Sequence, residues 1–154
     1  MTTILVAADA QWVRDQVRSA FVGPGQEVVE VTRGQEVREL YADVDPDLVI
    51  LDMQIGNMGG VAVALDLRLE ESAGRLDRAR ILLLLDREAD EFIGRRADVD
   101  MMLVKPVDAG VLRRAAKELL AIERPSSGLE EAVDAEGSMP PDEAGAELPV
   151  AEIS

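Results

Sequence analysis

Residues 46–60 read PDLVILDMQIGNMGG, and they contain the clearest indication of how this chain folds. Residues 48–51 form an apolar run that is too short for an independent helix and suits a strand buried on both faces. The run ends at Asp52, and a glycine-rich loop follows it. A carboxylate therefore stands at the carboxyl end of a strand, which is where parallel α/β sheets place ligands and chemistry.

The same alternation of apolar runs and helical spacing extends to both sides of this stretch. Asp108 can cap the last helical segment through its carboxylate. Five strand–helix units within residues 1–124 predict an α/β, flavodoxin-like (βα)5 domain, a doubly wound parallel sheet with strand order 2-1-3-4-5. The strand-like runs are residues 4–7, 28–31, 48–51, 81–85 and 101–104, and the helical segments lie around residues 13–21, 37–41, 61–69, 92–93 and 111–120.

Residues 125–154 differ in composition from the rest of the chain. They contain eight acidic residues, no basic residue and four prolines, so they carry about half of the net charge of −15. This composition is typical of an acidic, Pro/Gly/Ala-rich tail that is disordered unless bound to a partner. Its scattered apolar side chains are candidates for docking to that partner: Leu129, Val133, Leu148, Val150 and Ile153.

The composition excludes several kinds of chemistry. The chain has no cysteine and no histidine, which excludes thiolate metal sites, thiol catalysis, a histidine base and a phosphohistidine. It also has no phosphate-cradling loop of nucleotide-binding type, so we expect no enzymatic activity. The net charge of −15 argues against direct DNA binding, because a phosphate backbone would be repelled.

The ends and the hydropathy of the chain suggest where it acts. The chain starts without a basic stretch ahead of a long apolar run, and its longest apolar run, residues 81–85, is far shorter than a membrane span. We therefore expect no membrane insertion and a cytoplasmic location, with a peripheral position on a membrane complex as the alternative. Only 30 residues follow residue 124, so we expect no DNA-binding output domain after it.

Three polar residues follow predicted strands that are far apart in the sequence. Asp9 follows the first strand, Asp52 the third and Lys105 the fifth. Because the carboxyl ends of parallel strands meet at one edge of the sheet, we expect these side chains to converge. Two carboxylates and an ammonium suit a Mg²⁺ and phosphoryl site. Unrelated polar strand ends, which every sheet of this type has, are the alternative interpretation.

Two stretches resemble a known family. PDLVILDMQIGNMGG (46–60) and LVKPVDAGVLRRA (103–115) are similar to the phosphoacceptor loop and the Lys-Pro strand end of the receiver domain of bacterial two-component response regulators. The resemblance covers residues 3–122. It implies a role in phosphorelay signal transduction, in which Asp52 is the phosphoacceptor and Lys105 contacts the phosphoryl group.

The resemblance also implies a metal site and a backbone feature. Asp9, Asp52 and the backbone carbonyl of Gln54 match the positions that hold Mg²⁺ in receivers. Pro106 matches the proline that follows a cis peptide bond. No other cofactor is implied, and none is required by this interpretation.

Three positions depart from the pattern of the family. Ala8 stands where receivers have the first of two adjacent acids, so Mg²⁺ binding is possible but weakened. Leu85 stands at the position of the switch Thr or Ser, and it cannot donate a hydrogen bond to a phosphoryl oxygen. Met102 stands at the position of the switch aromatic residue, and we expect it to lie in the core in any state. These lost switch positions predict an atypical receiver whose output is independent of phosphorylation.

Three functions remain open. The first is an atypical receiver that acts as a protein–protein interaction module. The second is an accessory subunit of a larger assembly, because short orphan receiver-like proteins of actinobacteria look similar and some are thought to accompany respiratory NADH:quinone oxidoreductase (complex I). The third is a phosphorylatable single-domain response regulator with a histidine kinase as its partner.

Two surface features allow both a functional and a purely structural interpretation. Trp12 is a candidate anchor for a protein partner, or else it is partly buried over the edge of the sheet. The basic residues of the fourth and fifth helical segments form either a basic patch or solvated helix faces. These residues are Arg95, Arg96, Arg113, Arg114 and Lys117.

Overall fold

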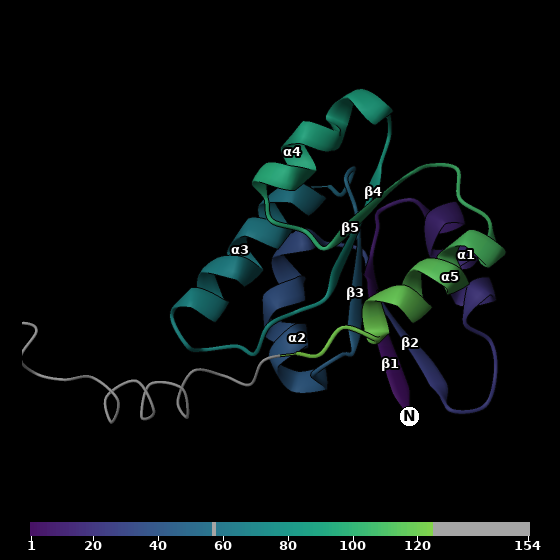
Figure 1. Cartoon of the computed structure of the whole chain (residues 1–154), viewed down its shortest axis with the longest axis horizontal. Coiled ribbons are helices and arrows are strands. Elements are labelled where there is room, and N and C mark those ends of the chain that lie inside the picture. The colour runs from purple at the N-terminus through teal and green to yellow at the C-terminus, as the bar shows by residue number, and fades with distance from the viewer. Residues whose placement is uncertain (57, 125–154) are drawn as a thin grey trace, which may run out of the picture.

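In the computed structural model, which describes residues 1–56 and 58–124, five parallel strands form one sheet of order β2-β1-β3-β4-β5 (Figure 1). The strands are β1 (Thr2–Ala7), β2 (Gln26–Val31), β3 (Leu48–Asp52), β4 (Ile81–Leu85) and β5 (Met101–Val104). The helices are α1 (Gln11–Ala20), α2 (Val37–Val44), α3 (Gly60–Ser72), α4 (Glu91–Arg96) and α5 (Ala109–Leu120), with single 3-10 turns at Gly34–Glu36 and Glu88–Asp90. The predicted fold class and strand order are confirmed.

The alternation of side chains along each strand explains why helices cover both faces of the sheet. In β1, Ile4 and Val6 belong to one core cluster, while Leu5 and Ala7 belong to the other. Helices α1 and α5 pack on the first face, and α2, α3 and α4 cover the second (Figure 1). Because β3 and β4 are central, every residue in them is buried, which is why they read as uninterrupted apolar runs.

The start of α5 and the register of the sheet confirm local predictions. The carboxylate of Asp108 accepts a hydrogen bond from the backbone N–H of Val111 at 2.8 Å, as an N-cap does. Leu51 of β3 pairs with Ala7 of β1. These pairings bring the carboxyl ends of the central strands to one edge of the sheet, so the residues that follow them lie close together.

A buried arginine network on α3 was not visible in the sequence. Arg68 is only 9% exposed. It donates to the backbone oxygens of Asp98 at 2.8 Å and Ala79 at 2.9 Å. It also pairs with the carboxylates of Glu71 at 2.8 Å and Asp100 at 2.9 Å. The network ties α3 to the segments that enter β4 and β5, at the edge of the sheet opposite Asp52.

The segment after α5 crosses this lower edge of the sheet. The guanidinium of Arg80, at the start of β4, donates to the backbone oxygen of Ile122 at 2.7 Å. Arg124 donates to the backbone oxygen of Arg78 at 2.9 Å and pairs with Asp45 at 3.1 Å. The last described residue therefore lies below the middle strands.

The predictions that concern the acidic tail, residues 125–154, lie outside the described residues, and so do its docking candidates Leu129, Val133, Leu148, Val150 and Ile153. Among the residues that the structure describes, none of the helices combines the length and the apolar character needed to cross a bilayer.

Candidate functional site

The centre of the site is the carboxylate at the end of β3. Asp52 is only 1% exposed. Its Oδ1 atom accepts a hydrogen bond from the Lys105 ammonium at 2.5 Å and another from the backbone N–H of Gln54 at 3.1 Å. Lys105 follows β5, and its peptide bond to Pro106 is cis, as the resemblance implied. The structure therefore brings Asp52 and Lys105 together as predicted.

A second carboxylate, which the sequence analysis did not single out, also binds the lysine. The Lys105 ammonium lies 2.9 Å from Oδ1 of Asp86, and the side-chain amide of Gln54 donates to Oδ2 of Asp86 at 2.7 Å. Lys105 therefore bridges two carboxylates, Asp52 and Asp86. The available signal was an acid directly after one strand and a lysine directly after its neighbour in the sheet.

These contacts shift the proton affinities of the lysine and of the second carboxylate. Burial alone would lower the pKa of Lys105, but hydrogen bonds to Asp52 and Asp86 outweigh it and leave this pKa above its ordinary value. Burial alone would raise the pKa of Asp86, but hydrogen bonds from Lys105 and Gln54 outweigh it and leave that pKa below its ordinary value. Both groups are therefore charged at neutral pH.

On the neighbouring loop, Asp9 faces the site from the end of β1. Its Oδ2 atom would lie 3.1 Å from a Cβ atom placed on Gly56, so the two loops approach closely. The guanidinium of Arg14 donates to the backbone oxygens of both Ala8 and Asp9 at 2.8 Å. Arg14 also pairs with Glu30 at 3.3 Å, so a carboxylate neutralises the guanidinium that holds this loop.

The predicted residues share one open depression of about 480 Å³. Trp12 stands at its side, 51% exposed, with the Lys105 ammonium 6.0 Å from the centre of its ring. At that distance a cation–π attraction is weak but favourable. The depression is lined by Asp9, Ala10, Trp12, Asp52, Gln54 and Lys105.

The two switch positions show apolar packing of different depth. Leu85 is completely buried at the end of β4. Met102 is half-buried and packs against the core cluster under α2, α3 and α4, so it lies at the margin of the core in which it was expected. Its burial is incomplete because β5 is an edge strand, and one side of it lacks a neighbouring strand. The Met102 sulfur packs beside Gly94 of α4.

The oxygen ligands available to Mg²⁺ are few. The carboxylates of Asp9 and Asp52 and the backbone carbonyl of Gln54 suit a hard cation that keeps several water molecules. Ala8 supplies no side-chain oxygen. Within residues 1–56 and 58–124, no group of three or more acidic side chains is close enough to hold a metal ion. Asp9 and Asp52, which line the same depression, are the two carboxylates that would hold Mg²⁺ here.

Comparison with known proteins identifies the family. A sequence model of the response regulator receiver domain matches residues 4–117, which is most of the chain. The chain belongs to the response regulator receiver domain family. Receiver domains typically bind Mg²⁺ in this cleft and interact with histidine kinases and other proteins in two-component systems.

Individual relatives agree with this assignment. Aerobic respiration control protein ArcA of Escherichia coli (strain K12) is 28% identical over 122 residues, covering 77% of this chain and 48% of that protein. Response regulator MprA of Mycolicibacterium vanbaalenii is 32% identical over 127 residues, covering 81% and 53%. The chain therefore spans about half the length of these two relatives.

A solved structure shows the likeness in fold. The receiver domain of the sensor histidine kinase PA1611 from Pseudomonas aeruginosa PAO1, which holds a magnesium ion in its active-site cleft, superposes with a TM-score of 0.65. The two chains are 19% identical, and the match covers 79% of this chain and 98% of that one.

Proposed function

We propose that this receiver domain is an atypical, non-enzymatic protein–protein interaction module whose output does not depend on phosphorylation of Asp52. The observation that carries the proposal is the bridged lysine. Lys105 binds two carboxylates, Asp52 at 2.5 Å and Asp86 at 2.9 Å. In a receiver that responds to phosphorylation, the lysine gains a contact with the phosphoryl group. Here the Asp86 carboxylate already gives the Lys105 ammonium an anionic partner.

The switch position at the end of β4 supports the same conclusion. A ligand shifts a conformational equilibrium only through contacts that differ between the two states. The side chain of Leu85 has no hydroxyl group, and it is completely buried. It offers no hydrogen bond that a phosphoryl group could gain, so the usual pull on the β4–α4 segment is missing.

The acidic edge is also poorly suited to strong metal binding. Ala8 supplies no carboxylate at the position where receivers have the first of two adjacent acids. Fewer negative ligands lower the affinity for Mg²⁺. Mg²⁺ would still bind through Asp9, Asp52 and the Gln54 carbonyl, where it would neutralise negative charge.

The partner in this proposal is a protein, and Trp12 is its anchor beside the site. An aromatic side chain that is 51% exposed supplies a large contact area at low entropic cost. Direct DNA binding is not part of the proposal, because the net charge is −15. The place of action is the cytoplasm, either free or on the surface of a larger assembly such as respiratory NADH:quinone oxidoreductase.

The experiment compares partner complexes formed by the full chain and by Asp52→Asn, each expressed in place of the native protein. Native gel filtration of cytosol and detergent-extracted membranes measures the fraction in a stoichiometric complex. Asp43→Asn is the matched control, because Asp43 is exposed on α2, far from the site. We expect the same fraction for all three proteins and a lower fraction for Trp12→Ala.

Two results would overturn the proposal. One is loss of the complex in Asp52→Asn but not in Asp43→Asn. The other is a change in the complexed fraction when the full chain is treated with a small phosphodonor and Mg²⁺. Either result would favour the phosphorylatable single-domain regulator with a histidine kinase as its partner.

A further inference from the structure

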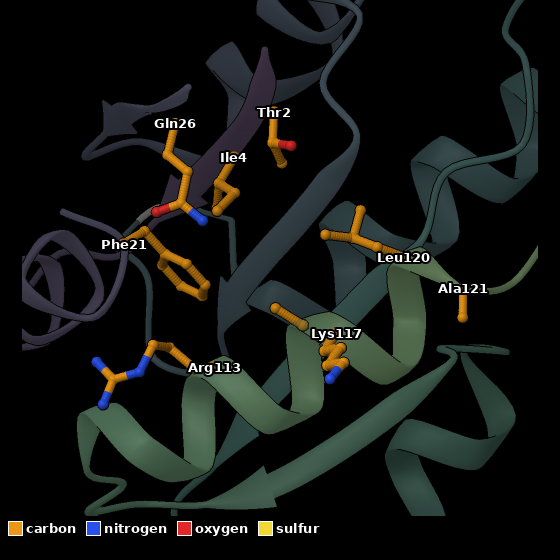
Figure 2. A pocket seen from close by; sticks show the side chains of 9 residues that line it. Thr2, Ile4, Phe21, Gln26, Arg113, Lys117, Leu120 and Ala121 are labelled. Atoms are coloured by element: carbon orange, nitrogen blue, oxygen red, sulfur yellow. The ribbon is translucent and has the colours of Figure 1, made fainter. Parts of the chain in front are cut away.

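A pocket on the face covered by α1 and α5 has no part in the site described above. It has a volume of about 420 Å³ and lies near the lower edge of the sheet. Its apolar lining includes Ile4 of β1, Phe21 at the end of α1 and Leu120 of α5. Figure 2 shows the Phe21 ring projecting into it, with Arg113 and Lys117 along the α5 side.

The rim of the pocket carries positive charge. Arg113 and Lys117 are exposed, and neither forms an ion pair with any residue of the described ranges 1–56 and 58–124. Arg113 makes one long contact, 3.4 Å to the backbone oxygen of Ala20. By contrast, the arginines of α1, Arg14 and Arg18, are both paired with Glu30. An apolar pocket beside two unpaired cations suits an anionic, partly apolar ligand.

The chain itself contains a segment with these properties. Residues 129–136 read LEEAVDAE, with four acids around Leu129 and Val133. The two apolar residues are four positions apart, and in a helix residues with this spacing lie on the same side. We propose that this acidic segment docks in the α1–α5 pocket, with Leu129 and Val133 on the apolar lining and its carboxylates on Arg113 and Lys117.

The geometry of the chain allows this contact. Leu120 and Ala121 line the pocket together with residues of β1, β2 and the rest of α5. Arg124 is only three residues beyond Ala121, so the two residues are at most about 11 Å apart. The five residues from Arg124 to Leu129 span up to about 17 Å when extended. Leu129 therefore reaches the pocket, and Val133 follows.

The acidic segment belongs to the same chain as the pocket, so it can occupy the pocket even if its intrinsic affinity is weak. A short linker gives an effective concentration on the order of millimolar, so docking needs only modest intrinsic affinity. The docked segment covers the same residues, Leu129 and Val133, that a protein partner would use. The pocket therefore acts as an internal competitor that any partner of this segment has to displace.

The test uses zero-length carbodiimide cross-linking of the full-length protein, which joins an amine to a carboxylate only when the two are in contact. The amines of the chain are those of Lys105, Lys117 and the Met1 α-amino group, and they lie in three different peptides, so each cross-link is assigned by mass spectrometry. Lys105 serves as an internal standard through its contacts with Asp52 and Asp86. We expect Lys117 to join a carboxylate of residues 130–136 within one chain, unchanged on dilution.

Two variants and one control make the result specific. The double variant Leu129→Ala/Val133→Ala should lower the yield of the Lys117 cross-link roughly tenfold, because it removes the apolar anchors. Arg113→Glu should lower it as well. Arg114→Glu makes the same charge change on α5 at a residue that does not line the pocket, and it should leave the yield unchanged.

Three outcomes would overturn the inference. Lys117 could join carboxylates evenly along residues 125–154, which indicates random encounters. The yield could be the same with Leu129 and Val133 replaced. The cross-link could form only between chains and vanish on dilution, which would assign the pocket to a second copy.

Discussion

Replacing Asp86 by alanine tests whether this carboxylate keeps the active-site lysine occupied. For Lys105 to contact a phosphoryl group on Asp52, its ammonium has to leave the Asp86 oxygen that lies 2.9 Å away. Asp86→Ala removes this competing carboxylate. Its side chain is 31% exposed, so no internal cavity results. We expect Asp52 to accept a phosphoryl group faster in the variant than in the native protein.

The size of the effect follows from the contacts that are lost. A hydrogen bond to a charged group contributes about 1.5–3 kcal/mol when buried. Because Asp86 is about a third exposed, solvent screening reduces the pair with Lys105 to about 1 kcal/mol. A free-energy difference of that size corresponds to a roughly fivefold change in rate.

The assay is intact-protein mass spectrometry during incubation with acetyl phosphate and Mg²⁺. The initial rate of the mass increase caused by one phosphoryl group is compared between proteins. Glu88→Ala is the matched control, because it removes one negative charge from an exposed residue two positions away. Asp52→Asn should show no increase at all.

Equal initial rates for Asp86→Ala and Glu88→Ala would refute the reasoning. That result would mean that Asp86 does not restrict Lys105 and that the slow step lies elsewhere, in metal binding at Asp9 or in the donor itself. If both variants are equally faster than the native protein, the loss of one negative charge at either position explains the increase, and the contact with Lys105 does not.

Three further predictions concern the stability of the domain. Arg68→Met leaves two backbone oxygens and two carboxylates of a buried network without their donor, so urea unfolding should show a loss of about 3–5 kcal/mol. The exposed Arg95→Met should change the free energy of unfolding little. Burial raises the pKa of Tyr41, the only tyrosine, to about 12. The ultraviolet absorbance of the ionised phenol should therefore appear near pH 12 and not near pH 10. Because the unfolded chain loses this proton first, the free energy of unfolding should fall by about 2 kcal/mol between pH 10 and 12, and Tyr41→Phe should remove that part of the decline. Gly60→Ala places a Cβ atom 2.4 Å from the backbone oxygen of Asp52, so thermal unfolding should show a loss of stability of about 1–3 kcal/mol. A variant as stable as the native chain would show that the β3–α3 loop moves to accommodate the extra methyl group.

The fold could be predicted because its signals are local. The apolar runs that became β3 and β4 are buried on both faces, and such strands need no partner information to be recognised. The strand order followed from the resemblance and from the short strand–helix units. The convergence of Asp9, Asp52 and Lys105 followed from topology alone, since the carboxyl ends of parallel strands share one edge.

The partners of the charged side chains could not be predicted in the same way. Asp86 and Lys105 are nineteen positions apart in the chain, and only the pairing of β4 with β5 places them in contact. Arg68 reads as a polar residue on a helix, yet it is buried because the segments entering β4 and β5 surround it. The half-buried state of Met102 likewise depends on β5 being the edge strand.

The sequence by itself determined the strands, the helices and the carboxylate at the edge of the sheet, because short apolar runs and helical spacing are properties of neighbouring residues. Only the tertiary structure decided which charges meet. It placed Asp86 on the ammonium of Lys105, and it left Arg113 and Lys117 beside an apolar pocket. Such contacts depend on distances between residues far apart in the chain, and these distances exist only after the sheet has formed.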